Sequence, residues 1–392
     1  MPADSPEVPK ALALFLTIFL IAVLAAFYWA GRQVLFGRPV LPESNKGPNR
    51  VRWGMGTMLF VLLFPQVLGV VVRGLYEVTR SDSVVIVNAR DRSVPSEPQR
   101  GRATTPKQIS YTEVMALNAV LSILILTSVP PLIGVATGVR LDDFGLTLNG
   151  AWRDLRIGST AFLIVTPMAQ LVFILAVKVF PSRKHPLEEM LRSVDLDWKV
   201  ILLAYVTSMI FAPVIEELIF RGLIQGWLSR LYYERKTSTL RDDAHEKFVT
   251  IGIPRPSRGL APLAAVARTS VFIPILITSL FFAAVHYPQM PAPFAIFVLS
   301  LGLGLLYERT RRLLPSIILH SLFNGFNTTV MVLQLLSDPH MDARVKSEPK
   351  TPPVVRIRDE NGGLSLARDA LAVRFPEAEG QGWSCNSLAI AV

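Results

Sequence analysis

Long apolar stretches alternate with shorter polar and charged ones along most of the chain. Most of the apolar stretches are about 18–25 residues long, the length an α-helix needs to cross roughly 30 Å of hydrocarbon. They cover Ala11–Ala30, Trp53–Val72, Val114–Val139, Ile157–Phe180, Trp198–Ile224, Thr269–Tyr287, Pro293–Tyr307 and Leu313–Leu336. The pattern predicts an all-α, polytopic transmembrane bundle of about eight helices.

The same pattern predicts three regions. Residues 1–150 hold the first three helices and a polar loop over 73–110, residues 151–336 hold the other five helices, and residues 337–392 form a polar, flexible tail. A charged segment, Ser229–Arg268, separates the fifth span from the sixth.

Several shorter features add to this outline. The leader Met1–Lys10 has one Lys against two carboxylates, so the first span is expected to be a retained anchor rather than a cleaved signal. Val84–Val87 is β-like, and the polar stretch Arg140–Arg156 is expected to lie along the membrane interface. The Lys and Arg content of four loops favours a topology with the N-terminus outside. The basic residues of the Arg73–Ser110 segment favour the opposite topology.

Composition narrows the class of protein. Hydrophobic residues make up 51% of the chain and charged residues 18%, which is typical of a multi-pass membrane protein, in the cell membrane if the host is bacterial. The net charge of +10 comes from basic residues between the apolar spans, so lipid headgroups rather than nucleic acid are the expected partners. The single cysteine, Cys385, excludes an intrachain disulfide and a Cys-based metal site.

Two adjacent carboxylates, Glu216 and Glu217, lie within the fifth apolar span. A charged side chain inside a membrane costs at least about 2.5–3.5 kcal/mol, so it indicates a functional site facing a polar cavity. Glu217 and Arg221 are four residues apart and fall on one helix face, where they can form an ion pair. Glu216 lies about 100° around the helix and has no local partner, which suits a general base. The alternative is a buried ion network that only holds helices together.

Three more polar residues stand at or within later apolar spans. His286 ends the sixth span, four residues after Phe282. His320 and Asn324 are four apart in the eighth span, so both project from one face. His286 alone is more typical of an interfacial or packing residue, and His320 with Asn324 could equally form a bond between neighbouring helices.

Together these groups favour hydrolytic chemistry. Buried polar side chains have to satisfy one another, and a shared water-filled cavity does so economically. In this interpretation Glu216 and His286 activate a water molecule, and His320 with Asn324 stabilise the oxyanion that forms when water attacks a peptide carbonyl. His185, His245 and His340 lie in polar segments and receive no role.

The motifs resemble those of a known family. Glu216-Glu217-x-x-x-Arg221, Phe282-x-x-x-His286 and His320-x-x-x-Asn324 are similar to the signatures of the CPBP intramembrane proteases, also called the Abi or CAAX-protease family, which includes the Rce1-type endopeptidases. The likeness covers roughly 200–336, about a third of the chain. It implies Glu216 as catalytic base, His286 as its partner, His320 and Asn324 as the oxyanion site, and Glu217, Arg221 and Phe282 as supporting residues.

The resemblance implies an intramembrane endopeptidase acting on a membrane-associated peptide or protein, such as one with a lipidated C-terminus. Glu216, His286 and His320 would be the ligands if the enzyme used zinc, and a metal-free glutamate mechanism, slightly preferred here, needs the same residues. Two other functions fit the pattern: a non-proteolytic immunity or scaffold protein of the same fold, and a transporter that uses the carboxylates as a relay.

Overall fold

The computed structural model of the chain describes residues 9–41, 53–81, 111–181, 186–192, 198–235 and 272–337. Most of these residues are helical and none of them forms a strand, which confirms the predicted all-α bundle. Seven helices among them are long and apolar enough to cross a membrane. They are α1 (Lys10–Leu35), α2 (Met55–Ser81), α3 (Tyr111–Thr137), α4 (Ala151–Val179), a continuous helix Trp198–Arg235, α11 (Ala292–Thr310) and α12 (Leu313–Leu336).

Of the sixth predicted span, the described residues form α10 (Phe272–Val285), a helix of 14 residues that ends two residues before the predicted Tyr287. The helix ends because the backbone turns at His286 and continues into a short 3₁₀-helix, η4 (Tyr287–Gln289), which has proline in its first turn. Residues 269–271 of the predicted span lie outside the described ranges.

The helix that carries the paired glutamates, here called the carboxylate helix, is Trp198–Arg235 and is longer than predicted. It consists of α6 (Trp198–Val206), a π-helical turn η2 (Thr207–Phe211), α7 (Ala212–Glu217), a second π-helical segment η3 (Leu218–Gln225) and a final stretch over 226–235. Seven residues of the predicted charged loop, 229–235, therefore belong to this helix. An Arg230–Glu234 pair at 2.7 Å supports its last turns.

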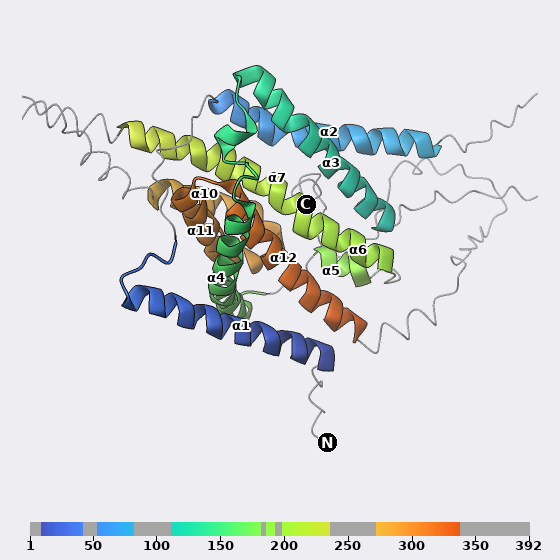
Figure 1. Cartoon of the computed structure of the whole chain (residues 1–392). Helices are drawn as coiled ribbons and strands as arrows, with labels where there is room; N and C mark the ends of the chain where they lie inside the picture. The colour runs from blue at the N-terminus through green and yellow to red at the C-terminus, as the bar shows by residue number, and fades with distance from the viewer. Residues whose placement is uncertain are drawn as a thin grey trace, which may run out of the picture.

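The bundle has a layered arrangement (Figure 1). On one side α1 packs on α4 and α12, and on the opposite side α2 and α3 pack together and against the carboxylate helix. Between these outer layers, α4 packs on α11 and α12, and α10 packs on α11. The carboxylate helix and α12 are thus both covered by other helices, which allows polar side chains to meet away from lipid.

The start of α12 is anchored to α4 and to the segment that precedes it. Arg312 donates hydrogen bonds from Nε to Asp154 Oδ2 at 2.5 Å and from Nη2 to the Thr147 carbonyl at 3.0 Å. The Leu313 amide donates to the Gly145 carbonyl at 3.0 Å. Gly145 has a φ of 80°, and a Cβ there would lie 2.5 Å from the Arg311 carbonyl oxygen, so the close approach requires glycine. These contacts fix where α12 begins.

The expected interfacial stretch over 140–156 contains a short 3₁₀-helix, η1 (Leu141–Phe144), before α4 starts at Ala151. Phe144 is buried and stacks on Trp53 with ring centroids 4.7 Å apart. A further short helix, α5 (Pro186–Arg192), precedes the carboxylate helix. The β-like piece at 84–87, the residues 1–8 at the start of the leader, the rest of the charged segment over 236–268 and the tail beyond Ser337 lie outside the described residues, as do His185, His245, His340 and Cys385.

Candidate active site

The three predicted motifs meet around one aromatic ring. Phe282 of α10 is almost fully buried. The guanidinium carbon of Arg221 lies 4.5 Å from the centroid of its ring, and the imidazoles of His286 and His320 lie 4.8 and 5.8 Å from it, centroid to centroid. A cation at that distance over a ring face is held by the ring quadrupole. Three separate helices therefore bring their polar residues to one place.

Glu217 is the inner carboxylate of this site and is fully buried. Its Oε1 accepts a hydrogen bond from Arg221 Nη1 at 3.1 Å and another from His320 Nδ1 at 2.9 Å. The ion pair expected from the four-residue spacing is thus present, and it includes a histidine from another helix. A buried carboxylate with two charge-assisted contacts is held firmly in one orientation.

Arg221 is held from its other side by α11. Its Nη2 donates to the Ser300 hydroxyl at 2.8 Å and to the Ser300 carbonyl at 3.3 Å. Sequence reasoning missed Ser300, although a serine between two leucines in an apolar span was a signal for it. Arg221 therefore links the carboxylate helix to α11 while it neutralises Glu217.

The hydrogen bonds of the two imidazoles define their neutral tautomers. His286 Nδ1 lies 2.7 Å from the Phe282 carbonyl oxygen, which can only accept, so Nδ1 carries the proton. His320 Nδ1 donates to a carboxylate oxygen for the same reason. The neutral form of each ring then has its lone pair on Nε2.

Glu216 is the outer carboxylate. Its side chain is 13% exposed, against 0% for Glu217, and its Oε2 lies 3.7 Å from His320 Nε2. That distance is too long for a hydrogen bond, and Oε2 has no hydrogen-bond partner among the described residues. A water molecule beside the two atoms could contact both. The structure thus places the imidazole of His320 next to Glu216.

The Asn324 side chain makes a contact between two helices. Its Nδ2 donates to the Ser208 carbonyl at 2.9 Å, in the π-helical turn η2. A widened turn does not use its carbonyls in the ordinary α-helical pattern, so a side-chain donor can serve one of them. The carboxamide has a second N–H, which can still donate to a substrate.

The side chains present do not fit a zinc site. Among the described residues, no group of three His, Cys, Asp or Glu side chains is arranged to hold a metal ion, so Glu216, His286 and His320 are not positioned as a ligand set. The Arg221 guanidinium, bonded to Glu217, already supplies a positive charge there.

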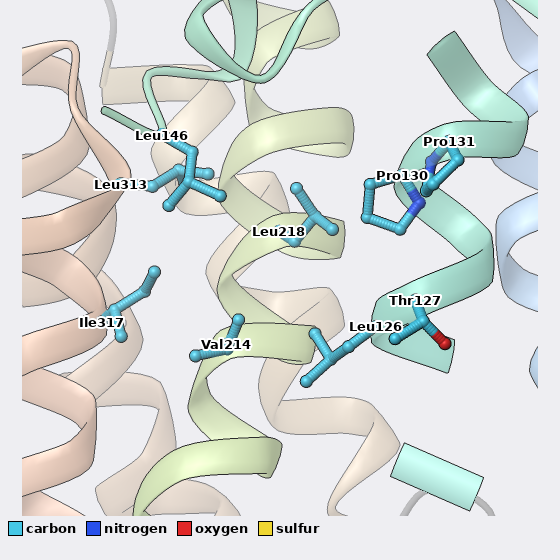
Figure 2. Close-up of a pocket in the computed structure, with 9 residues that line it drawn as sticks. All are labelled: Leu126, Thr127, Pro130, Pro131, Leu146, Val214, Leu218, Leu313 and Ile317. Atoms are coloured by element: carbon cyan, nitrogen blue, oxygen red, sulfur yellow. The ribbon is translucent and has the colours of Figure 1, made fainter. Parts of the chain in front are cut away.

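A cavity of about 330 Å³ lies beside another face of the carboxylate helix (Figure 2). Its walls are apolar and come from α3, the segment before α4, the carboxylate helix and α12. Val214 and Leu218, one turn apart on the carboxylate helix, point into it, whereas neither Glu216 nor Glu217 lines it. This cavity is therefore distinct from the polar site.

The fold and the site define a multi-pass integral membrane protein with buried acid and imidazole groups. Residues 198–326, about a third of the chain, match the family model of the type II CAAX prenyl endopeptidases, Rce1-like, and this confirms the predicted resemblance. The matched segment contains Glu216, His286, His320 and Asn324. Neither the comparison with curated proteins nor that with solved structures found a match. The family match supports an intramembrane protease activity in general, with a peptide or protein as substrate.

Proposed function

We propose that the chain is an intramembrane endopeptidase in which Glu216 activates the attacking water. The observation that carries this proposal is the difference between the two adjacent carboxylates. Glu217 is buried and engaged by Arg221 and His320, whereas Glu216 is partly exposed and keeps an oxygen without a hydrogen bond beside His320 Nε2. A general base needs an available oxygen within reach of water. Each carboxylate has an Oε2 without a hydrogen-bond partner among the described residues, but Glu217 is fully buried, so the partly exposed Glu216 is the one that water can reach.

The proposed reaction proceeds by general base catalysis. Glu216 takes a proton from water, the hydroxide oxygen bonds to the peptide carbonyl carbon, and the π electron pair of the carbonyl moves onto its oxygen. When the tetrahedral intermediate collapses, this electron pair re-forms the carbonyl, the C–N bond breaks and the proton passes from Glu216 to the leaving amine. Atoms and charges balance without a further reactant.

The oxyanion requires donors, and the α12 residues can supply them. In its doubly protonated form His320 donates Nδ1–H to Glu217 and has Nε2–H left for the oxyanion, and Asn324 offers its second amide N–H. Glu217 orients the His320 ring for this task. His286, with Nδ1 bound to the Phe282 carbonyl, is proposed to assist the water through Nε2.

The proposed substrate is membrane-associated, because the site lies between helices that cross the bilayer. The particular form that the family description suggests is a C-terminal CAAX sequence, from which a tripeptide is removed after a lipidated cysteine. A peptide held near the membrane by its lipid would be delivered at high local concentration.

The test is cleavage of a fluorogenic, prenylated CAAX peptide and of its unprenylated form by the purified protein in lipid nanodiscs. Glu216→Gln is expected to lower kcat by about 10²–10⁴-fold, because it removes the base and keeps the shape. The matched control is Glu188→Gln, at a carboxylate paired with Arg192 on α5, which is expected to cleave like the wild type.

Retained cleavage by Glu216→Gln would overturn the mechanism. A folded wild-type protein that cleaves no membrane peptide would favour the scaffold or transporter instead. Loss of activity with a zinc chelator, restored by zinc, would show that a metal and not a free glutamate activates the water. Cleavage of the prenylated peptide alone would define the substrate class.

A further inference from the structure

A row of buried polar residues continues from the site along the carboxylate helix. Glu217, Arg221, Gln225 and Ser229 follow one another at intervals of four, and all are fully buried. On α11 three residues at the same interval, Ser300, Gly304 and Glu308, face them. We call the contacts between these two sets the polar ladder.

The ladder is built in constant register. Arg221 Nη2 donates to Ser300 Oγ at 2.8 Å, Gln225 Nε2 to the Gly304 carbonyl at 2.9 Å, and Ser229 Oγ to Glu308 Oε2 at 3.0 Å. Each of these three pairs is separated by 79 residues, so the two helices run parallel without a shift between rungs. Gln225 Nε2 also lies 3.3 Å from Glu308 Oε2, which joins the last two rungs.

A glycine makes the close approach possible. A Cβ at Gly304 would lie 3.0 Å from Gln225 Oε1 and 2.9 Å from the Ile275 side chain. The far end of the ladder carries its own ion pair, because Arg311 Nη2 lies 2.5 Å from Glu308 Oε1. The Glu308 carboxylate is therefore held in place from two sides.

Polar contacts of this kind determine register better than apolar ones. Leucine side chains pack nearly as well after a small shift, whereas a buried amide or carboxylate that loses its partner costs the desolvation of both groups. A slip of only part of a turn, with about 5.4 Å to a full turn, would break every rung of the ladder.

We propose that Gln225 and Glu308 are positioning residues for the active site. They hold α11 in register with the carboxylate helix, so that Ser300 presents its oxygens to Arg221, and Arg221 in turn holds Glu217 against His320. This positioning role rests on the proposed function, but its first test is the NMR signals of the His320 ring, which require no substrate. A failure of the positioning role can thus be distinguished from a failure of the proposed peptidase function.

The experiment uses full-length protein labelled with ¹⁵N-histidine in nanodiscs. The chain has five histidines, and the signals of His320 are assigned by their loss in His320→Gln. Gln225→Met, which keeps the length of the side chain and removes its amide, is expected to shift the Nδ1 and Nε2 signals of His320. Glu308→Leu is expected to do the same, and Glu308→Gln, which retains an acceptor for Ser229, is expected to restore most of the wild-type spectrum.

The matched control is Ser122→Ala, because Ser122 is fully buried and its hydroxyl donates to Asn118 within α3. In a peptidase assay, Gln225→Met is expected to lower kcat between about tenfold and a hundredfold while KM changes little, because a small misplacement of catalytic groups acts on the chemical step. Ser122→Ala should leave both constants and the His320 signals unchanged.

His320 signals and kcat that stay at wild-type values in Gln225→Met would overturn the proposal, as would changes no larger than those of Ser122→Ala. Ser229→Ala provides a milder variant if the larger changes prevent folding. It removes a single hydroxyl and is expected to move the same His320 signals by a smaller amount, and an unchanged spectrum in a folded Ser229→Ala protein also counts against the ladder.

Discussion

The outer helices α1 and α2 differ from the inner helices α11 and α12 in hydropathy and in the share of their residues that is buried in the protein. Within its most apolar stretch, each of α1 and α2 has 17% of its residues buried in the protein, whereas the values are 50% for α11 and 44% for α12. The two outer helices nevertheless have the higher mean hydropathy. In a soluble protein the most apolar helix would be the most buried, but here lipid covers it. The lower hydropathy of α11 and α12 comes from residues such as Ser300, Glu308 and His320, which face other helices.

This comparison predicts that equal substitutions have unequal effects in the two regions. Inner positions depend on contacts with neighbouring side chains, whereas outer positions mostly contact lipid. Pairs of identical substitutions can therefore test the comparison, and the expected differences decrease from buried charge to helix packing to a single hydroxyl.

Removal of a buried charge should show the largest difference. Arg221→Met leaves Glu217 buried without its ion-pair partner, so it is expected to lower the free energy of unfolding by about 3–5 kcal/mol. Arg32→Met, at an exposed arginine near the end of α1, should leave the free energy unchanged. Both are measured by SDS-induced unfolding in mixed micelles. Equal effects would mean that the Glu217–Arg221 pair is hydrated rather than buried.

Substitution of a helix glycine should show an intermediate difference. In Gly158→Ala the new Cβ would lie 2.7 Å from Ile318 Cβ and from the Pro315 carbonyl, so α4 and α12 must separate at a cost of about 1–3 kcal/mol. Nothing lies within 4 Å of a Cβ at Gly31 of α1, so Gly31→Ala should be neutral or stabilise by up to about 1 kcal/mol. Thermal unfolding in detergent measures both, and a Gly158→Ala protein as stable as the wild type would contradict the close packing of α4 on α12.

Loss of one hydroxyl should show the smallest difference. Thr328 Oγ1 lies 3.1 Å from Ser208 Oγ across two helices, and such interhelical bonds contribute about 0.6 kcal/mol on average. Thr328→Val should lower stability by that amount. Thr17→Val removes a hydroxyl that bonds to the Ala13 carbonyl of its own helix and should have no measurable effect. The same unfolding titration measures both variants. A larger loss of stability in Thr17→Val than in Thr328→Val would contradict the comparison.

Much of the fold was predictable because apolar stretches of membrane-spanning length are strong signals. The ends of the helices were not. The carboxylate helix runs at least to Arg235, with an Arg230–Glu234 pair in its last described turns, and α10 ends at the turn at His286. The π-helical turns were also not predictable, since a widened turn leaves the apolar composition of a helix unchanged.

The site was predictable where its partners are close in sequence. The Glu217–Arg221 pair follows from the four-residue spacing, and the motifs indicated His286, His320 and Asn324 as further members. The catalytic roles of these residues remain predictions. Contacts between distant segments could not be paired from the sequence: Ser300 lies 79 residues from Arg221, and the Ser208 carbonyl lies 116 residues from Asn324. Only the tertiary arrangement shows that one imidazole lies beside both glutamates.

The π-helical segment Leu218–Gln225 affects how the polar side chains of the carboxylate helix align in a row. In an α-helix with 3.6 residues per turn, residues four apart overshoot a full turn by about 40°, so a long row at that spacing winds around the helix. The wider turns of this segment reduce the overshoot and direct Arg221 and Gln225 toward the same neighbour, α11. Loss of a single residue in this segment would restore regular winding and rotate every later side chain relative to Glu217. The length of the segment therefore matters as much as its chemistry.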